Sequence, residues 1–481
     1  MVLSHLFGQA DYEKFNEIID NLPEGLITDE EVLELELQSW MKSEVRKLMI
    51  LGEEYYKNKT DIRTTKKVDL DWKSNNKLEH DFVKKLVNQK VGYLLSKQPT
   101  ISTEKDTYAK LLEEEVFNRN NLKTIKNLGK ESINKGIAFL YVHYDENGEF
   151  RIRKLKSERI LPFWADDEHT EVQAFLYFYD EVRYINKLKK TVTLVEYHHP
   201  YGITHFILDG GKLVLNVEKE EQTYHAKIGE QELLWERIPL IPFKYNEEEQ
   251  PLIDSIKSLV DNYNLQASTN ADLLADIPHF IYKLVGYEGE SLAEFMENLR
   301  TFRAIKFGEG GDLDKLQATP QTEAAEKEID RDRKSIYEFG RGVDTTDDDL
   351  GNASGVALRY RYSDLDMDCN ILESEFQSSL EHLIWFVDQH FILTGRGDFT
   401  NDSVDIIFNR DIIINESEVI EDCSNSVGIL DDKTIRENHP WYTRDVEQRL
   451  KEQEASMQQK TNEQLKQEYN AAFNKDVNNN E

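Results

Sequence analysis

Cysteine is scarce in this chain of 481 residues, which carries only Cys369 and Cys423. Two cysteines cannot form the disulfide framework typical of small secreted domains, so we expect a reducing compartment. The first ten residues also lack the charged start and long apolar run of a signal peptide. We therefore expect a soluble protein that is made in the cytoplasm.

Basic residues are in short supply as well. Lysine and arginine together number 59 against 92 aspartates and glutamates, which gives a formal net charge of -33. Proteins that grip nucleic acid through its phosphates rely on clusters of Lys and Arg. The charge balance therefore argues against an ordinary DNA-binding module, but not against a protein that DNA merely passes.

Long hydrophobic runs are missing too. The most apolar window, residues 380–393, is interrupted by Glu381, Asp388 and His390. A bilayer span needs about 20 predominantly apolar residues, so we expect no membrane-spanning helix and no membrane partner.

The sequence has none of the usual signs of catalysis or metal binding. It contains no nucleophile elbow, no zinc-finger spacing and no catalytic Cys/His arrangement. His198 and His199 are adjacent and would face opposite sides of a strand, so a metal ion shared with His205 is disfavoured against a structural role. We predict no catalytic residue, no cofactor and no metal ion.

The chain does have a long motif over residues 319–393. Pro320 suits the first position of a helix and Thr319 can cap its free amides, so a charged helix should run through Phe339 and stop near Gly340. Residues 340–352 lack periodicity and are rich in glycine, short polar side chains and carboxylates, which predicts a flexible, solvated loop. After Ser354, apolar residues recur at helical intervals over about 40 residues.

The rest of the chain indicates an α+β protein. Helical periodicity covers residues 28–57, 78–95 and 108–135, and strand patterns follow between residues 136 and 243. A mostly polar helix with one apolar stripe occupies residues 251–275, which should leave its other side to water or to another subunit. Three predictions complete the outline: a strand–helix–strand insertion (280–285, 291–302, 304–307), a strand pair (404–408, 411–414), and a short helix (433–437) before a charged one (440–459).

Several stretches, in a fixed order along the chain, carry a resemblance to a known family: residues 75–78 with 88–94 and 98–99, residues 136–140, residues 238–243 with 251–253, residues 351–360, and residues 428–430 with 438–441. They resemble portal proteins of tailed bacteriophages, in the branch of long-tailed phages of Gram-positive hosts. The segment Gly351-Asn352-Ala353-Ser354-Gly355-Val356-Ala357-Leu358-Arg359-Tyr360 is similar to the stretch that follows the tunnel loop of those proteins.

The resemblance implies the portal fold and a division of the chain. Long stem helices, a β-rich wing, a small α/β clip and a helical crown would assemble as a ring. The implied parts are a wing (1–250), stem helices (251–277 and 319–340), a clip (278–318), a tunnel loop (341–355), a long helix with wing strands (356–426), a crown (427–459) and a disordered tail (460–481).

The candidate functional residues lie in the loop and in the helix before it. The tunnel loop would comprise Asp344, Thr345, Thr346, Asp347, Asp348, Asp349, Leu350, Gly351 and Asn352. In a ring these carboxylates would line the narrowest part of a channel and keep a DNA duplex from sticking. Candidates for the channel wall are Glu323, Glu326, Lys327, Asp330, Arg331 and Lys334. Opposite charges three or four residues apart can pair along this helix.

Two less specific interpretations remain open for the acidic loop. Its aspartates could form a solvated turn without any ligand, or they could bind a divalent ion for a metal-dependent hydrolase. The loop lacks the glycine spacing and terminal Glu of an EF-hand, and no histidine partner stands near it. The resemblance favours a non-enzymatic portal.

The resemblance also implies partners and a location. The chain would form a homo-oligomeric ring, typically a 12-mer, in the virion at a capsid vertex, after assembly in the host cytoplasm. Its partners would be the terminase large subunit, a head-completion adaptor, scaffolding and major capsid proteins, and double-stranded DNA passing through the channel.

The C-terminal tail offers a first test. Residues 460–481 are rich in Gln, Asn, Lys and Glu and have few apolar side chains, so they should add nothing to a packed core. Truncation after Gln459 should therefore leave assembly unchanged when measured by native mass spectrometry. Loss of assembly on this deletion would refute the disordered-tail prediction.

Overall fold

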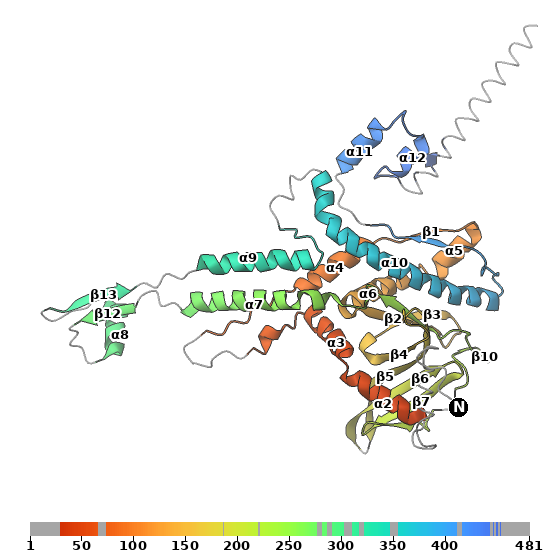
Figure 1. The fold of residues 1–481 in the computed structure, drawn as a ribbon, viewed down its shortest axis with the longest axis horizontal. Helices are drawn as coiled ribbons and strands as arrows, with labels where there is room; N and C mark the ends of the chain where they lie inside the picture. Colours follow the sequence, from red (N-terminus) through yellow and green to blue (C-terminus); the bar gives the residue numbers. More distant parts are fainter. Residues whose placement is uncertain are drawn as a thin grey trace, which may run out of the picture. The chain divides into compact units, whose positions relative to one another are not determined.

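A computed structural model describes residues 29–65, 74–185, 187–219, 222–276, 281–285, 291–302, 310–316, 322–346, 355–410 and 416–442, with residues 446, 449, 450 and 453. The chain divides into two compact units. The first comprises Met1–Asp347 and Arg361–Asp411, and the second comprises Asp348–Tyr360 and Ile412–Glu481. The mixture of helices and sheets in Figure 1 confirms the α+β class predicted from the sequence.

Helices of the first unit surround its largest apolar core. The core joins α3 (Glu44–Tyr56), α4 (Phe82–Leu95), α6 (Arg119–Lys135), α7 (Leu252–Asp276) and α10 (Gly355–Leu393). The 39 residues of α10 confirm the predicted long amphipathic helix. Leu372, Phe376 and Leu380 on this helix are almost fully buried, whereas Met367 and Ile371 are exposed.

Two antiparallel sheets form the β-rich part. One has the order β4-β5-β6-β7-β8 and the other the order β11-β2-β3. Their bounds are β2 (Ile137–Tyr144), β3 (Phe150–Leu155), β4 (Ile160–Trp164), β5 (Val172–Ile185), β6 (Leu188–His199), β7 (Gly202–Asp209), β8 (Lys212–Leu215) and β11 (Leu240–Lys244). The strand patterns between residues 136 and 243 predict five strands, at 138–142, 150–153, 175–179, 192–197 and 204–208. All five are present, as β2, β3, β5, β6 and β7, with β5 and β6 much longer than predicted. A small hairpin of β9 (Ala226–Ile228) and β10 (Gln231–Leu233) lies between β8 and β11 in sequence.

Two helices predicted as continuous are each broken in two. The interval 28–57 forms α2 (Asp29–Lys42) and α3, because the Ser43 hydroxyl accepts a hydrogen bond from the Arg46 amide and so caps a new helix. The interval 108–135 forms α5 (Asp106–Glu115) and α6, because the Asn118 side chain accepts from the amides of Asn120 and Asn121. Apolar periodicity alone does not reveal such a break, since both halves keep an apolar face.

The helix predicted from residue 78 begins only at Phe82, because the preceding residues lie extended against α7. We call residues 74–80 the strap. Alternate backbone amides of the strap donate to side chains spaced four apart on α7: Ser74 to Asp276 (2.7 Å), Asn76 to Asp272 (2.7 Å), Leu78 to Ser268 (2.9 Å) and His80 to Asn264 (3.1 Å). Two extended residues advance about 6.6 Å and four helical residues about 6.0 Å, so the two repeats match.

The predicted insertion between α7 and α9 (Thr322–Phe339) and the strand pair predicted after α10 are only partly described. The insertion contains β12 (Ile281–Val285), α8 (Leu292–Phe302) and β13 (Asp312–Leu316), while the strand predicted at 304–307 lies outside the described residues. The first strand predicted after α10 is present as β14 (Asp405–Ile407), which pairs with the distant β1 (Thr100–Ser102), and its predicted pairing with residues 411–414 stays a prediction. Residues 411–414 lie outside the described part.

The second unit has two short described helices. They are α11 (Glu416–Asn425), which the sequence did not predict, and α12 (Asp432–Glu437), which it did. The loop residues before α10 and most of residues 440–481 lie outside the described part. None of the described helices is long and apolar enough to cross a membrane.

A glycine at the end of α6 provides a test of the packing. Gly136 has φ of 84°, and a Cβ there would lie 1.8 Å from the Glu249 carbonyl oxygen. Gly136→Ala should therefore destabilise the fold by roughly 3 kcal/mol or more, from backbone strain plus the clash. Gly210→Ala is the matched control, because Gly210 has φ of 61° with nothing within 4 Å of an added Cβ; it should cost only about 1 kcal/mol. Equal losses in urea unfolding would contradict the close approach.

Candidate functional site: the stem and the base of the tunnel loop

The two predicted stem helices, α7 and α9, lie side by side in the structure (Figure 1). The side-chain amide of Asn262 on α7 donates a hydrogen bond to the carboxylate of Asp332 on α9 at 2.7 Å. Apolar side chains of both helices are buried as well. Ile336 and Tyr337 of α9 are buried, as are Ile256, Val260 and Tyr263 of α7. The apolar stripe predicted on α7 therefore faces a core.

The strap corrects one expectation about α7. Its polar side was predicted to remain open to water or to another subunit. Asn264 and Ser268 are instead fully buried beneath the strap and accept hydrogen bonds from its backbone. Leu265 and Leu273 stay exposed on the same helix, so only part of the polar side is covered.

The six predicted channel-wall residues of α9 are all exposed: Glu323, Glu326, Lys327, Asp330, Arg331 and Lys334. The spacing of opposite charges predicts three ion pairs on α9, of which Glu323 with Lys327 (2.7 Å) and Glu328 with Arg331 are present. The third, Asp330 with Lys334, is not formed in the described part of the chain. Exposed pairs of this kind contribute little to stability. These six residues thus lie on the side of α9 opposite its buried face. That this side faces a channel stays a prediction.

Two glycines let the chain turn sharply out of α9. The amide of Gly340 donates to the Ile336 carbonyl and that of Gly342 to the Tyr337 carbonyl, which ends the helix. A Cβ on Gly340 would lie 2.7 Å from a methyl group of Leu86, and one on Gly342 would lie 2.2 Å from its other methyl group. Larger residues would push the loop away from α4, so glycine fixes this close approach.

We call residues 340–346 the loop base. Polar contacts hold its second half, residues 343–346. The side-chain amide of Gln89 on α4 both donates to the Val343 carbonyl (3.0 Å) and accepts from the Val343 amide (2.9 Å). Arg333 donates to both oxygens of Asp344, at 2.6 and 2.9 Å. This bidentate pair holds the pKa of the Asp344 carboxyl down at about 2.

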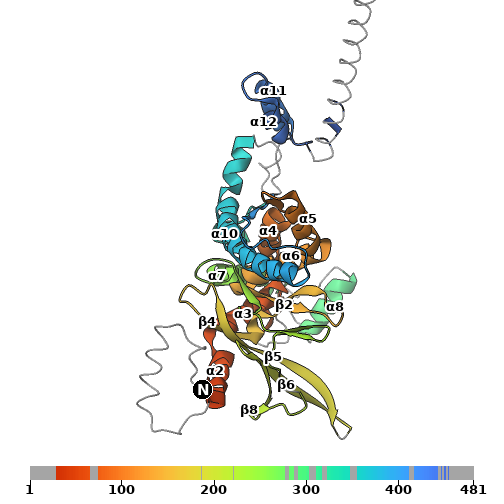
Figure 2. The same cartoon turned by 90° about the vertical axis from the view of Figure 1, so that its right-hand side faces the viewer.

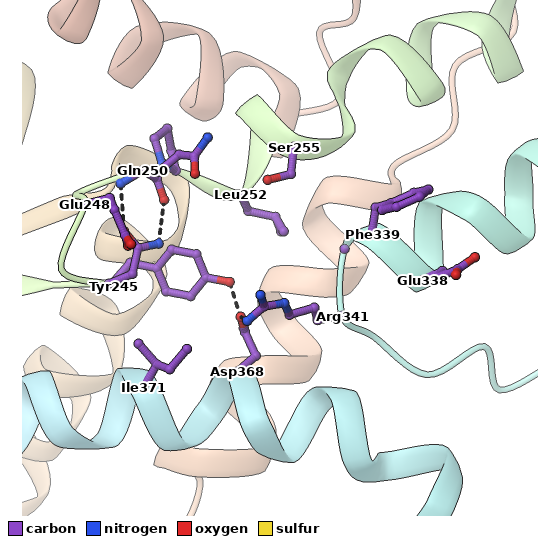
Figure 3. A pocket seen from close by; sticks show the side chains of 13 residues that line it. Tyr245, Glu248, Gln250, Leu252, Ser255, Glu338, Phe339, Arg341, Asp368 and Ile371 are labelled. Carbon is purple, nitrogen blue, oxygen red and sulfur yellow. Dashed lines mark hydrogen bonds and ion pairs between the residues drawn. The ribbon is translucent and has the colours of Figure 1, made fainter.

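A buried charge cluster lies beneath the loop base (Figure 3). The ammonium of Lys90, which has no solvent exposure, donates to Asp368 of α10 at 2.6 Å and to the Arg341 carbonyl at 3.1 Å. The Tyr245 hydroxyl donates to the same Asp368 oxygen at 2.7 Å, and Arg341 approaches its other oxygen at 3.4 Å. Burial, with the Asp368 charge in second place, raises the pKa of Tyr245 well above its usual value. The cluster therefore ties α4, α10 and the loop base together.

A cavity of about 490 Å³ opens beside this cluster. Its lining combines the first turn of α7 with Phe339, Arg341 and Ile371, and Figure 3 shows Arg341 and Tyr245 pointing toward Asp368 within it. Among the described residues, no group of three His, Cys, Asp or Glu side chains could hold a metal ion. The residues around the cavity thus form a junction between α7, α10 and the loop base.

The predicted loop residues are only partly described. Asp344 is half-buried and forms an ion pair with Arg333, so its charge is compensated within the subunit. The backbone amide of Thr346 donates to its carboxylate, and Thr345 is exposed. Asp347, Asp348, Asp349, Leu350, Gly351 and Asn352 lie outside the described residues. Sequence analysis missed Gln89, Lys90 and Asp368 as part of this site. The one available signal was Lys90 at helical spacing from Leu86, Val87 and Leu94, on the apolar face of the predicted helix.

The Arg333–Asp344 pair predicts a pH-dependent stability. Because the folded pKa of about 2 lies below the ordinary 3.8, the pair stabilises the fold above about pH 4 and this contribution is lost as the pH falls through 2. Asp344→Asn should lower the free energy of unfolding by roughly 1–2 kcal/mol at pH 7 after allowance for partial exposure, and by progressively less below pH 4. Urea unfolding over this pH range measures it.

Asp330→Asn is the matched control for that experiment. Asp330 carries the same charge on the exposed face of α9, so its replacement should change stability by no more than about 0.5 kcal/mol. Equal effects of the two substitutions would show that the pair is not the cause.

Comparisons with known proteins identify one family for this chain. Residues 42–463 match the family described as "Phage portal protein, SPP1 Gp6-like". The chain is 28% identical to the portal protein of Bacillus phage SPP1 over 470 residues, covering 94% of this chain and 91% of that protein. It is 27% identical to the portal protein of Clostridium phage phiCD119, covering 84% of this chain and 91% of that protein.

Two solved structures are more distant. The neck of a native GTA particle computed with C12 symmetry has 12% identity and a TM-score of 0.40 over 74% of this chain and 88% of that one. The neck of an empty GTA particle computed with C6 symmetry has 12% identity and a TM-score of 0.42 over 81% and 92%. The comparisons lend no support to a metal-dependent hydrolase. Since the family match spans most of its length, the chain belongs to the phage portal proteins of the SPP1 Gp6-like family.

Proposed function

We propose that this portal protein works as a closed ring of twelve copies at one capsid vertex, with a central channel through which double-stranded DNA enters and leaves. Phage portal proteins are virion components of a structural, non-catalytic family. The observation that carries the proposal is the continuous unit of α9 and loop base. Its exposed side is charged, and its other side is anchored to α7, α4 and α10.

In this proposal each part of the chain has a mechanical task. The paired helices α7 and α9 act as the stem, residues 278–318 as the clip, and residues 427–459 as the crown. The two sheets with α2–α6 form the wing, to which β14 returns. Residues 341–355 form the tunnel loop, which the buried Lys90–Asp368 pair holds by its base. The loop would then be attached to a rigid base while DNA passes it.

The charge of the chain suits passage rather than grip. Twelve copies at -33 carry roughly 400 negative charges, which repel the phosphates of a duplex and prevent tight adhesion to the wall. Lys327, Arg331 and Lys334 interrupt the acidic side chains on α9 and limit the repulsion between copies. A polyanion in such a channel would be neither trapped nor strongly excluded.

The proposed partners follow from this role. The terminase large subunit would dock during packaging and hydrolyse ATP, so the ring itself needs no chemistry. Scaffolding and major capsid proteins would surround it during assembly in the host cytoplasm, and a head-completion adaptor would bind afterwards.

Replacing Asp347, Asp348 and Asp349 together by lysine tests the channel assignment. The triple variant should still form a closed ring by native mass spectrometry, because the loop base does not involve these residues. DNA filling in an in vitro packaging assay should fall by about tenfold or more, since a ring of lysines attracts phosphates. The effect should weaken as salt rises.

The same three residues changed to asparagine are the control. This variant removes the charge without reversing it, so it should package closer to the unmodified ring. Unchanged packaging by the lysine variant would contradict the channel position of the loop. A purified chain that never closes into a ring would overturn the proposed function as a whole.

A further inference from the structure

The β5–β6 hairpin extends past the sheet to which it belongs. β4 pairs with β5 only as far as Tyr177, and β7 pairs with β6 only from Thr193 onward. Residues 181–192, which we call the arm, therefore pair only with each other among the described strands. Figure 2 shows this end of the hairpin leaving the body of the sheet at the lower right. A two-stranded arm of this kind has little stability of its own unless something covers it.

The arm presents apolar side chains to solvent. Tyr184 is 74% exposed, Leu188 65% and Val182 49%. A tyrosine and two aliphatic residues at a projecting tip form the kind of patch that anchors a protein interface, because Tyr offers a large contact area with a polar end. The arm is thus an interaction surface by its shape and composition.

The arm is also basic, although the whole chain is strongly acidic. Residues 183–190 hold Arg183, Lys187, Lys189 and Lys190 and no acidic residue. Arg183 already pairs with Glu181 and Glu218. The three lysines are exposed and form no ion pair within the described part of the chain. A partner for this surface should therefore be acidic and should also offer apolar contact.

A complementary surface exists on the same subunit, at α2. This helix packs Leu33 and Leu37 onto the five-stranded sheet and has five acidic residues and a single basic one. Three of its exposed residues are Glu30, Glu36 and Leu35, the last of which is 57% exposed. In Figure 2, α2 lies beside the N-terminal mark, well separated from the end of the arm. One subunit therefore displays two opposite patches that do not meet each other.

We propose that the arm of one copy docks on α2 of the next copy, so that this contact repeats around the ring. Two different patches joined head to tail form a heterologous interface, and such an interface closes into a ring when the rotation between neighbouring copies adds up to a full turn. The lysines meet the glutamates of α2, and Tyr184 and Leu188 cover Leu35. The proposal rests on the ring assembly proposed above and adds the residues that join neighbouring wings.

Charge reversal tests the contact. The arm variant Lys187→Glu, Lys189→Glu, Lys190→Glu should raise the concentration needed for half-assembly by about tenfold or more at low salt, with a smaller effect at high salt. The α2 variant Glu30→Lys, Glu36→Lys should do the same. A chain that carries all five substitutions should assemble nearly as well as the unmodified protein, because opposite charges meet again. Native mass spectrometry across a dilution series measures all three.

The control variant reverses three exposed lysines elsewhere: Lys110→Glu, Lys123→Glu and Lys227→Glu. It changes the net charge equally and should assemble nearly as the unmodified chain does. Circular dichroism of each variant confirms that the fold is kept.

The possible outcomes separate this inference from the ring itself. If the unmodified chain closes into rings and the arm variant does so equally well, the arm contact is wrong and the ring stands. Loss of assembly without rescue by the combined variant would also overturn the contact, as would intact rings that fail only to enter capsids, because the arm would then meet a different protein. If the unmodified chain forms no ring, the proposed function fails first.

Discussion

The buried pair of Lys90 and Asp368 is the interaction on which the site depends. Taking a lysine and an aspartate out of water is costly, and their attraction offsets that cost only where geometry is good and the remaining polar groups are satisfied. Here Asp368 also accepts from Tyr245, and Lys90 also donates to the backbone of Arg341. Loss of either partner would leave a buried charge unpaired, so three distant segments of the chain are held in one arrangement.

Above this pair, the loop base is held by shape and by hydrogen bonds of several kinds. Gly340 and Gly342 allow contact with Leu86, Gln89 pairs with the backbone of Val343, and Arg333 pairs with Asp344. These contacts come from α4, α9 and the loop itself, so the path of the chain from stem to loop is defined on several sides. These contacts therefore fix the position from which the chain enters the rest of the loop.

The strap satisfies buried polar groups of α7. Asn264 and Ser268 of α7 continue the row of the buried Ile256 and Val260, and both would be costly to bury without partners. The strap supplies backbone amides at a matching spacing, so both segments satisfy each other's hydrogen bonds. Residues 75–78 and 88–94, which carried part of the family resemblance, thus form the strap and the α4 side chains that hold the loop base. Their structural role gives that resemblance a physical basis.

The sequence by itself determined the class of fold, the long helix after the acidic loop, the helices α7 and α9, five strands and the family, because periodicity, helix ends and composition are local properties. It could not place the breaks at Ser43 and Asn118, the strap, the pairing of β14 with β1, or the cluster of Lys90, Tyr245 and Asp368. Each of these depends on segments far apart in the chain, where a side chain or backbone amide finds its partner only after folding. The charge of the acidic loop could be read from the sequence, whereas the pairing of Asp344 with Arg333 was decided by how α9 and the loop base pack together.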